Sequence, residues 1–163
     1  EWIELMNDSD ASVDLSGWKI EAEDGSPVIS LSGVIAAQGY FLIERTDDSS
    51  VPEVSADLVA AFGSGLGNTG ETLRLRDTAG SVVDTVVGGT DWSLIGGDNA
   101  TKDTPQRLQK SNTWIVATPT PRAVTVSSGA VLGASTTGSD QTQTQPQTTA
   151  SASTTRTPGT APG

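Results

Sequence analysis

The chain opens with Glu1-Trp2-Ile3-Glu4-Leu5-Met6-Asn7, and Asp14-Leu15-Ser16-Gly17-Trp18-Lys19-Ile20 follows after a short polar loop. In the first stretch Ile3 and Leu5 share one side of an extended chain, whereas Trp2 and Glu4 share the other. The same alternation runs through Trp18–Glu23 and predicts a half-buried β-strand there.

Two hairpins are predicted from turn chemistry. Asp24-Gly25 supplies the positive-φ turn that joins the preceding strand to a return strand near Val28–Leu31. Further along, Thr72–Asp77 and Ser81–Val87 flank a turn in which Gly80 takes the left-handed conformation. Each hairpin adds two antiparallel strands to one sheet.

The remaining segments complete an all-β pattern. Tyr40–Arg45 is apolar on both faces, as a central strand would be, and a turn near Val54–Ala61 is the one candidate for a helix. Short strands separated by turn residues predict a sandwich or a barrel. We therefore expect one β-sandwich domain over residues 1–126.

The order of the motifs resembles the lamin-tail domain, a family found in bacteria as well as in nuclear lamins. The segments that carry the resemblance are Glu1–Asn7, Asp14–Trp18, Gly39–Leu42, Asn68–Leu75, Gly80–Asp84, Pro105–Leu108, Trp114 and Pro119–Pro121. The resemblance implies an immunoglobulin-like β-sandwich that binds partners or supports structure and is not an enzyme. The family also has an earlier strand that this chain starts after. We therefore expect a fragment of a longer protein with one open sheet edge.

Within these segments, particular residues match the family pattern. They are Trp2, Glu4, Asn7, Asp14, Gly17, Trp18, Asn68, Gly70, Glu71, Asp84, Gln106, Arg107 and Trp114. Two of the motifs, Asp14–Gly17 and Asn68–Glu71, lie in loops. Turn preferences and side-chain to backbone hydrogen bonds explain both without any ligand. A binding loop is the alternative for both motifs.

Composition excludes much catalytic chemistry. The chain has no cysteine and no histidine, so disulfides, thiolate metal sites and a Ser-His-Asp triad are excluded. We expect no cofactor, no catalytic residue and no metal ligand. The run Gly63–Gly67 lacks the Lys-Ser/Thr of a phosphate-binding loop and is interpreted as a turn.

Charge separates the chain into two parts. The net charge is −11, and after Val126 only Asp140 and Arg156 are charged. A negative field of this size repels phosphate backbones, so direct binding of nucleic acid is not expected. Residues 127–163 are rich in Ser, Thr, Gln, Ala, Gly and Pro, a composition that predicts a disordered linker or stalk. A surface stalk and a linker between soluble domains both fit.

Two further groups of residues have a structural and a functional interpretation. Carboxylates cluster at several places, and the loop Gly96–Asp103 offers the most oxygen ligands, but Lys102 within it argues against calcium. A solvated acidic surface explains these clusters.

Of the tryptophans, we expect Trp18 in the core and Trp2, Trp92 and Trp114 at strand edges or the sandwich ends. Stacking on sugars is the alternative.

Together these features predict a non-catalytic interaction or structural module at a bacterial cell surface, with an unknown protein or surface polymer as its partner. Membrane tethering would come from segments outside this chain. An accessory module that binds substrate or positions a secreted nuclease- or phosphoesterase-like hydrolase is the second candidate. A filament role is the third and lacks a heptad-bearing segment in this chain.

Overall fold

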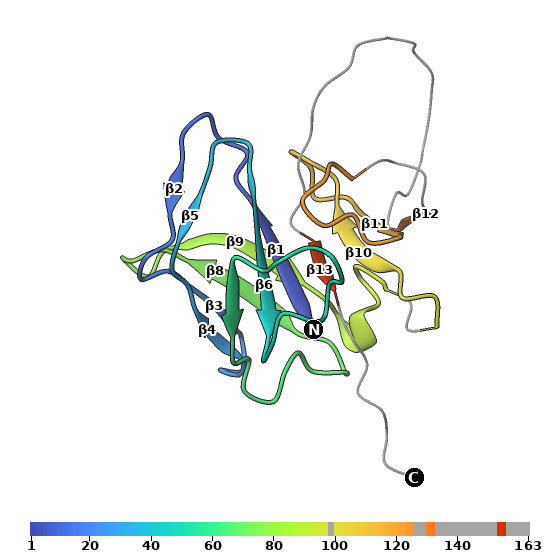
Figure 1. Ribbon diagram of the computed structural model, residues 1–163. Helices are drawn as coiled ribbons and strands as arrows, with labels where there is room; N and C mark the ends of the chain where they lie inside the picture. The colour runs from blue at the N-terminus through green and yellow to red at the C-terminus, as the bar shows by residue number, and fades with distance from the viewer. Residues whose placement is uncertain (98–99, 126–129, 133–152, 156–163) are drawn as a thin grey trace.

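The computed structural model describes residues 1–97, 100–125, 130–132 and 153–155. Apart from one 3₁₀ turn, η1 (Thr90–Trp92), every regular element among these residues is a β-strand. A four-stranded sheet in the order β4-β3-β8-β9 lies beside a seven-stranded sheet in the order β12-β11-β10-β13-β1-β6-β7, and β2 pairs with β5 (Figure 1). The predicted all-β class is confirmed.

The first nine strands lie between Trp2 and Val87. They are β1 (Trp2–Met6), β2 (Val13–Asp14), β3 (Lys19–Ala22), β4 (Val28–Ser30), β5 (Val34–Ile35), β6 (Tyr40–Arg45), β7 (Leu58–Ala60), β8 (Thr72–Arg76) and β9 (Val82–Val87). Both predicted hairpins form: β3 pairs with β4, and β8 pairs with β9. Gly25 and Gly80 have φ values of 93° and 82°, as their turns require.

One apolar core lies between the two sheets. Ile3 and Leu5 of β1 and Phe41 and Ile43 of β6 pack in a single cluster with residues of β3 and β8, among them Ile20. Each of these side chains is less than a tenth exposed. Burying a side chain of this size contributes about 1.5–3 kcal/mol, so this cluster is the main source of stability. The sandwich of two sheets is the immunoglobulin-like arrangement expected.

The opposite face of β1 and β6 is also covered. Trp2, Leu42 and Val51 form a second apolar cluster beneath the loop that follows β6. The predicted helical turn near Val54–Ala61 is wrong, because Leu58–Ala60 forms β7, parallel to β6. Asp57 favours the extended path, since its carboxylate accepts the Leu42 amide at 2.7 Å and continues the edge of β6.

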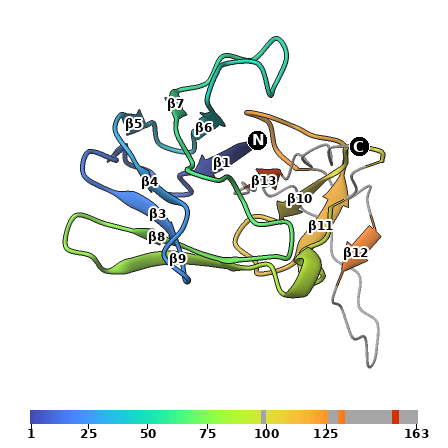
Figure 2. The same ribbon diagram turned by 90° about the horizontal axis from the view of Figure 1, so that it is seen from below.

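The second half of the chain forms a hairpin of β10 (Thr104–Arg107) and β11 (Trp114–Ala117). Two short strands lie beyond Val126: β12 (Ala130–Leu132) pairs with β11, and β13 (Ser153–Thr155) lies between β1 and β10 (Figure 2). These six residues pair although composition predicted a disordered tail, because a free sheet edge accepts any extended backbone. The rest of the predicted linker, residues 127–129, 133–152 and 156–163, lies outside the described residues.

Three of the four tryptophans are more deeply buried than predicted, and the fourth, Trp18, is less buried. Trp2, Trp92 and Trp114, predicted at strand edges or sandwich ends, are 3%, 3% and 8% exposed. Trp18 packs against the core but is only half-buried, because it precedes β3 and faces an open cleft. The packing interpretation therefore fits all four rings, with Trp18 the most accessible.

Candidate functional site

The candidate site lies where the sandwich and the β10–β11 hairpin meet. Strand β13 is antiparallel to both β1 and β10, so β1 and β10 run in the same direction with one strand between them. The pairs between β1 and β13 join Trp2 with Thr155, Ile3 with Thr154 and Glu4 with Ser153. Beyond Glu4 the two flanking strands continue and enclose a cleft of about 580 Å³.

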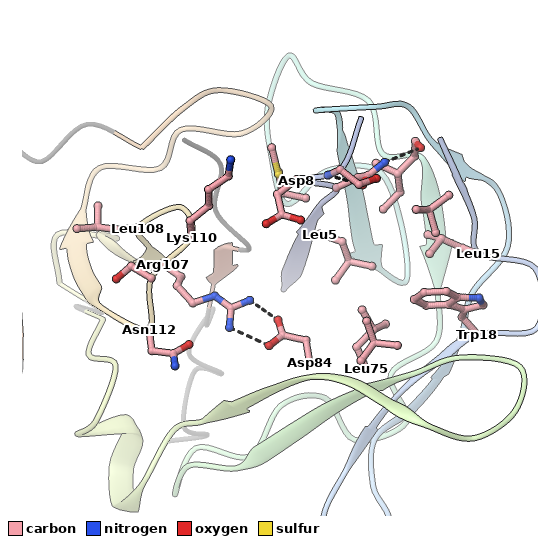
Figure 3. A pocket seen from close by; sticks show the side chains of 17 residues that line it. Leu5, Asp8, Leu15, Trp18, Leu75, Asp84, Arg107, Leu108, Lys110 and Asn112 are labelled. Atoms are coloured by element: carbon pink, nitrogen blue, oxygen red, sulfur yellow. Dashed lines mark hydrogen bonds and ion pairs between the residues drawn. The ribbon is translucent and has the colours of Figure 1, made fainter. Parts of the chain in front are cut away.

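The cleft has an apolar side and a polar side. Leu5, Leu15, Trp18 and Leu75 line it from the sandwich (Figure 3). Across from them the turn of the β10–β11 hairpin contributes Leu108, Lys110, Ser111 and Asn112, and the loop after β1 contributes Asp8 and Ser9. This combination suits a ligand that has apolar groups together with hydrogen-bonding groups.

An ion pair crosses the cleft. Arg107 Nη1 of β10 donates to Asp84 Oδ1 of β9 at 2.9 Å, and Arg107 Nη2 pairs with the second carboxylate oxygen (Figure 3). The guanidinium carbon also lies 5.6 Å from the centroid of the buried Trp114 ring. A bidentate pair of this kind fixes geometry as well as adding energy, and it ties the hairpin to the sandwich.

Lys110 differs from the other described cations of the chain. Lys19, Arg45, Arg74, Arg76, Arg107 and Arg122 each form an ion pair. The exposed Lys110 makes no hydrogen bond or ion pair with the described residues, although the protein carries a net charge of −11. A free ammonium at the mouth of an apolar cleft is available to a negatively charged ligand group.

The first two motifs of the sequence hold the loop that forms one wall of the cleft. Asn7 is buried, and its side-chain amide donates to the carbonyl oxygens of Ala11 at 2.7 Å and Ala36 at 3.0 Å. Asp14 accepts the Ser16 amide at 2.8 Å, and hydrogen bonds from the Ser16 side chain and amide lower the pKa of the Asp14 carboxyl group. Gly17 completes the turn with φ 79°. These contacts agree with the structural interpretation of both segments.

The Asn68–Glu71 loop lies away from the cleft. The Glu71 carboxylate accepts the Gly67 amide, and burial raises the pKa of Glu71 above its ordinary value. Gly70 is required sterically, because a Cβ at this position would lie 1.8 Å from the carbonyl oxygen of Gly89. The buried Trp92 ring donates from Nε1 to the Gly67 carbonyl at 2.7 Å. Gly70 and the Glu71 carboxylate therefore hold this loop against η1.

Two motif residues are buried polar groups beside β13. Glu4 is 1% exposed, and its carboxylate accepts the Arg122 amide at 2.7 Å. Burial raises the pKa of Glu4 to about 7. Gln106 is fully buried and donates to the Thr118 carbonyl at 2.8 Å. Through these hydrogen bonds Glu4 attaches the segment after β11 to β1, and Gln106 attaches it to β10.

The acidic clusters form no metal-binding site in the described part of the chain. Among these residues no group of three or more carboxylates is placed to hold a metal ion. In the loop considered for calcium, Asp98 and Asn99 lie outside the described residues, and Asp103 accepts from Thr101 Oγ1 at 2.7 Å. Within the described ranges no helix has both the length and the apolar character that a membrane crossing requires.

Sequence reasoning missed the cleft itself and the position of Lys110 in its lining. Residues from β1, β8, β9 and the β10–β11 turn line the cleft, so no local pattern brings them together. The one sequence signal was the expected open edge of the first strand. In the structure β13 pairs along one edge of β1, from Trp2 to Glu4.

Comparison with known proteins identifies one family. The family model described as Lamin Tail Domain matches residues 1–90, which include the motif residues from Trp2 to Asp84. Gln106, Arg107 and Trp114 lie beyond the matched range. No curated protein and no solved structure matches the chain.

Proposed function

We propose that this chain, which belongs to the lamin tail domain family, is a non-catalytic interaction module displayed outside a bacterial cell. The observation that carries the proposal is the cleft beside β1, which combines an apolar wall with Lys110, an exposed cation without an ion-pair partner in the described part of the chain. Pockets of this composition bind ligands through apolar burial and a few placed polar groups.

The described polar groups support a binding role more than a reaction. Asp84 and Arg107 neutralise each other, Gln106 is engaged with backbone, and the raised pKa of Glu4 belongs to a carboxyl group buried away from the cleft wall. A general base must reach a substrate proton, which a carboxyl group 1% exposed does not do. We infer that the chain holds a partner and does not transform it.

Display at the surface is supported by the composition of the chain. The sequence has no cysteine, carries its negative charge on residues 1–126, and ends in a segment rich in Ser, Thr and Pro that suits a stalk. Reading the gene beyond Glu1 and Gly163 tests this part. A secretion signal upstream and a membrane or wall anchor downstream are expected, and the absence of both would contradict surface display.

An accessory module of a secreted hydrolase is the second candidate. It is favoured by Trp18, a half-buried ring in the cleft wall that could stack on a sugar of a polymeric substrate. A catalytic domain in the same gene, together with binding of this chain to that enzyme's substrate, would establish this role. Binding to a protein partner without such a domain would support the first candidate.

A further inference from the structure

We propose that the outer edge of β4 pairs with the same edge of a second copy of this chain, so that two four-stranded sheets join through an antiparallel contact between the two β4 strands. Strands β4 and β9 form the two edges of that sheet (Figure 2), and the cleft is lined by β9 and not by β4. The inference therefore goes beyond the proposed function and concerns a separate surface.

The hydrogen bonds between β3 and β4 show which backbone groups of β4 are already paired. At one end of this ladder the Ala22 amide donates to the Pro27 carbonyl at 2.9 Å. At the other end the Leu31 amide donates to the Trp18 carbonyl at 2.8 Å. In an antiparallel ladder alternate residues direct their N–H and C=O groups to opposite edges. The odd-numbered residues of this segment therefore face β3, and the even-numbered residues face outward.

Val28 and Ser30 are the residues of β4 that face outward, and their backbone groups have no hydrogen-bond partner among the described residues. The side chain of Val28 is 49% exposed, and Ser30 is exposed too. Earlier on the same edge the Ser26 amide is already taken, because it donates to the Asp24 carboxylate at 3.1 Å. The free part of the edge is therefore β4 itself, with an N–H and a C=O group from each of its two outward residues.

The other edge of this sheet has features that block strand addition, and β4 has none of them. In β9 the Asp84 carboxylate accepts the outward Thr85 amide at 2.8 Å and also pairs with Arg107. The register between β8 and β9 is irregular at Leu75 and Arg76, which bends that edge. Strand β4 has a regular register and contains neither a charged residue nor a proline. Charges, bulges and prolines are the usual protection of an edge strand, so β4 is the edge suited to pairing.

The outward residues of β4 are complementary to themselves. When two copies meet antiparallel across a twofold axis, Val28 of each copy lies opposite Ser30 of the other. Both pairs then exchange N–H···O=C bonds, and every outward donor and acceptor of β4 gains a partner. Pairing with β3 already orders this strand in each copy, so the contact loses less conformational entropy than the binding of a flexible peptide does. A second copy is therefore the occupant that the edge fits best.

The charges beside β4 permit this approach although the chain carries a net charge of −11. On the outer face of β3 and β8 and in the turn before β4, positive and negative residues are equal in number: Lys19, Arg74 and Arg76 against Glu21, Glu23 and Asp24. Ion pairs join Lys19 and Arg76 to Glu21, and Arg74 to Glu23. This surface is therefore locally neutral, and it repels a second copy less than the acidic remainder of the domain does.

The contact is small, which sets its expected strength. Across the antiparallel pair the two Val28 side chains are diagonal neighbours about 7–8 Å apart on the outer face, so they add only a limited apolar contact to the backbone bonds. Interfaces of this size are weak, and we expect a dissociation constant on the order of 100 µM.

The test uses the whole chain over a range of concentrations. Sedimentation equilibrium from about 10 µM to about 1 mM should show a reversible equilibrium between monomer and dimer. Hydrogen exchange identifies the surface: the Val28 and Ser30 amides should exchange at least about tenfold more slowly at the highest concentration than at the lowest. The Ile29 amide faces β3 and should exchange slowly at both. A monomer throughout this range, or a dimer in which the Val28 and Ser30 amides stay unprotected, would overturn the proposal.

Substitutions on the two edges of the sheet supply the matched variants. Ser30→Pro removes an outward N–H group but no hydrogen bond to β3, so it should weaken the dimer at least about tenfold. Val28→Lys places a charge on the edge and should weaken it similarly, without depending on how the proline variant folds. Val87→Lys, the same change at a valine of β9 that is 47% exposed, should stay within about twofold of the parent. Equal dissociation constants for Val28→Lys and Val87→Lys would show that β4 is not the contact.

Discussion

The two edges of β1 are paired to different degrees. On one edge β1 pairs with β6 from Trp2 to Met6, and further hydrogen bonds at Glu1 and Asn7 extend the ladder at both ends. On the other edge β13 covers three residues, and the cleft begins where that ladder ends. The first edge is part of the folding core and is paired along its whole length, whereas the described pairing on the second edge ends at Glu4.

Two buried carboxylates attach neighbouring segments to this sheet, one from nearby in the sequence and one from far away. Glu44 of β6 is buried and accepts the amides of Ser50 and Val51, six and seven residues along the chain. Glu4 of β1 accepts the amide of Arg122, 118 residues away. The β6 side is therefore closed by a local loop. The β13 side depends on contacts between distant parts of the chain.

The largest effect is expected from Trp114→Ala on the hairpin side of the cleft. Removing this buried ring takes away its packing in the core cluster and its contact with Arg107, which should cost about 3–5 kcal/mol of unfolding free energy. Urea denaturation provides the measurement. Trp18→Ala, the same change at a half-buried ring, should cost clearly less, and equal losses would show that the hairpin is not docked as described.

A smaller effect is expected from the buried carboxyl group of Glu4, measured as a function of pH. Its pKa rises from 4.5 in the unfolded chain to about 7 in the folded protein, so the folded state holds the proton more tightly. The stabilisation is present below pH 4.5 and is lost as the pH rises to about 7. Glu4→Gln should therefore match the parent at low pH and exceed it by about 3 kcal/mol above pH 7.

The control for this prediction is the same substitution at the exposed Glu53, which removes one negative charge without altering a buried group. A constant difference between Glu4→Gln and the parent across this range would mean that Glu4 is not buried as a protonated group. The segment after β11 would then be held by contacts other than the Arg122 amide.

The smallest of the stability effects is expected at the ion pair across the cleft. Asp84→Asn leaves Arg107 with weaker acceptors and should cost about 1–3 kcal/mol, with a smaller cost at high salt because both groups are partly exposed. Asp8→Asn on the opposite lip should change stability by less than about 0.5 kcal/mol. Urea denaturation at two salt concentrations distinguishes the two variants. Equal losses of unfolding free energy would show that the ion pair does not help to hold the hairpin against the sandwich.

The sequence predicted what is local in this fold. Hairpins at Gly25 and Gly80 follow from turn residues, and the two-residue alternation of β3 identifies its buried face. It could not predict β7, whose pairing with β6 depends on the Asp57 carboxylate accepting a distant amide. Nor could it place Lys110 across from Leu5, since only the packing of the hairpin beside β1 brings these residues to one cleft.

The most direct test of the account is residue-resolved amide hydrogen exchange of β1 in the free chain. The Ile3 and Leu5 amides face β6 and should exchange slowly, near the global unfolding rate, whereas the Met6 amide faces the cleft and should exchange at least about a hundredfold faster. Ser153→Pro removes the amide that faces Glu4, so it should speed exchange at Trp2 and Glu4 and leave Ile3 and Leu5 unchanged. Equal protection of Leu5 and Met6 would contradict the account, because β1 would then have no open edge.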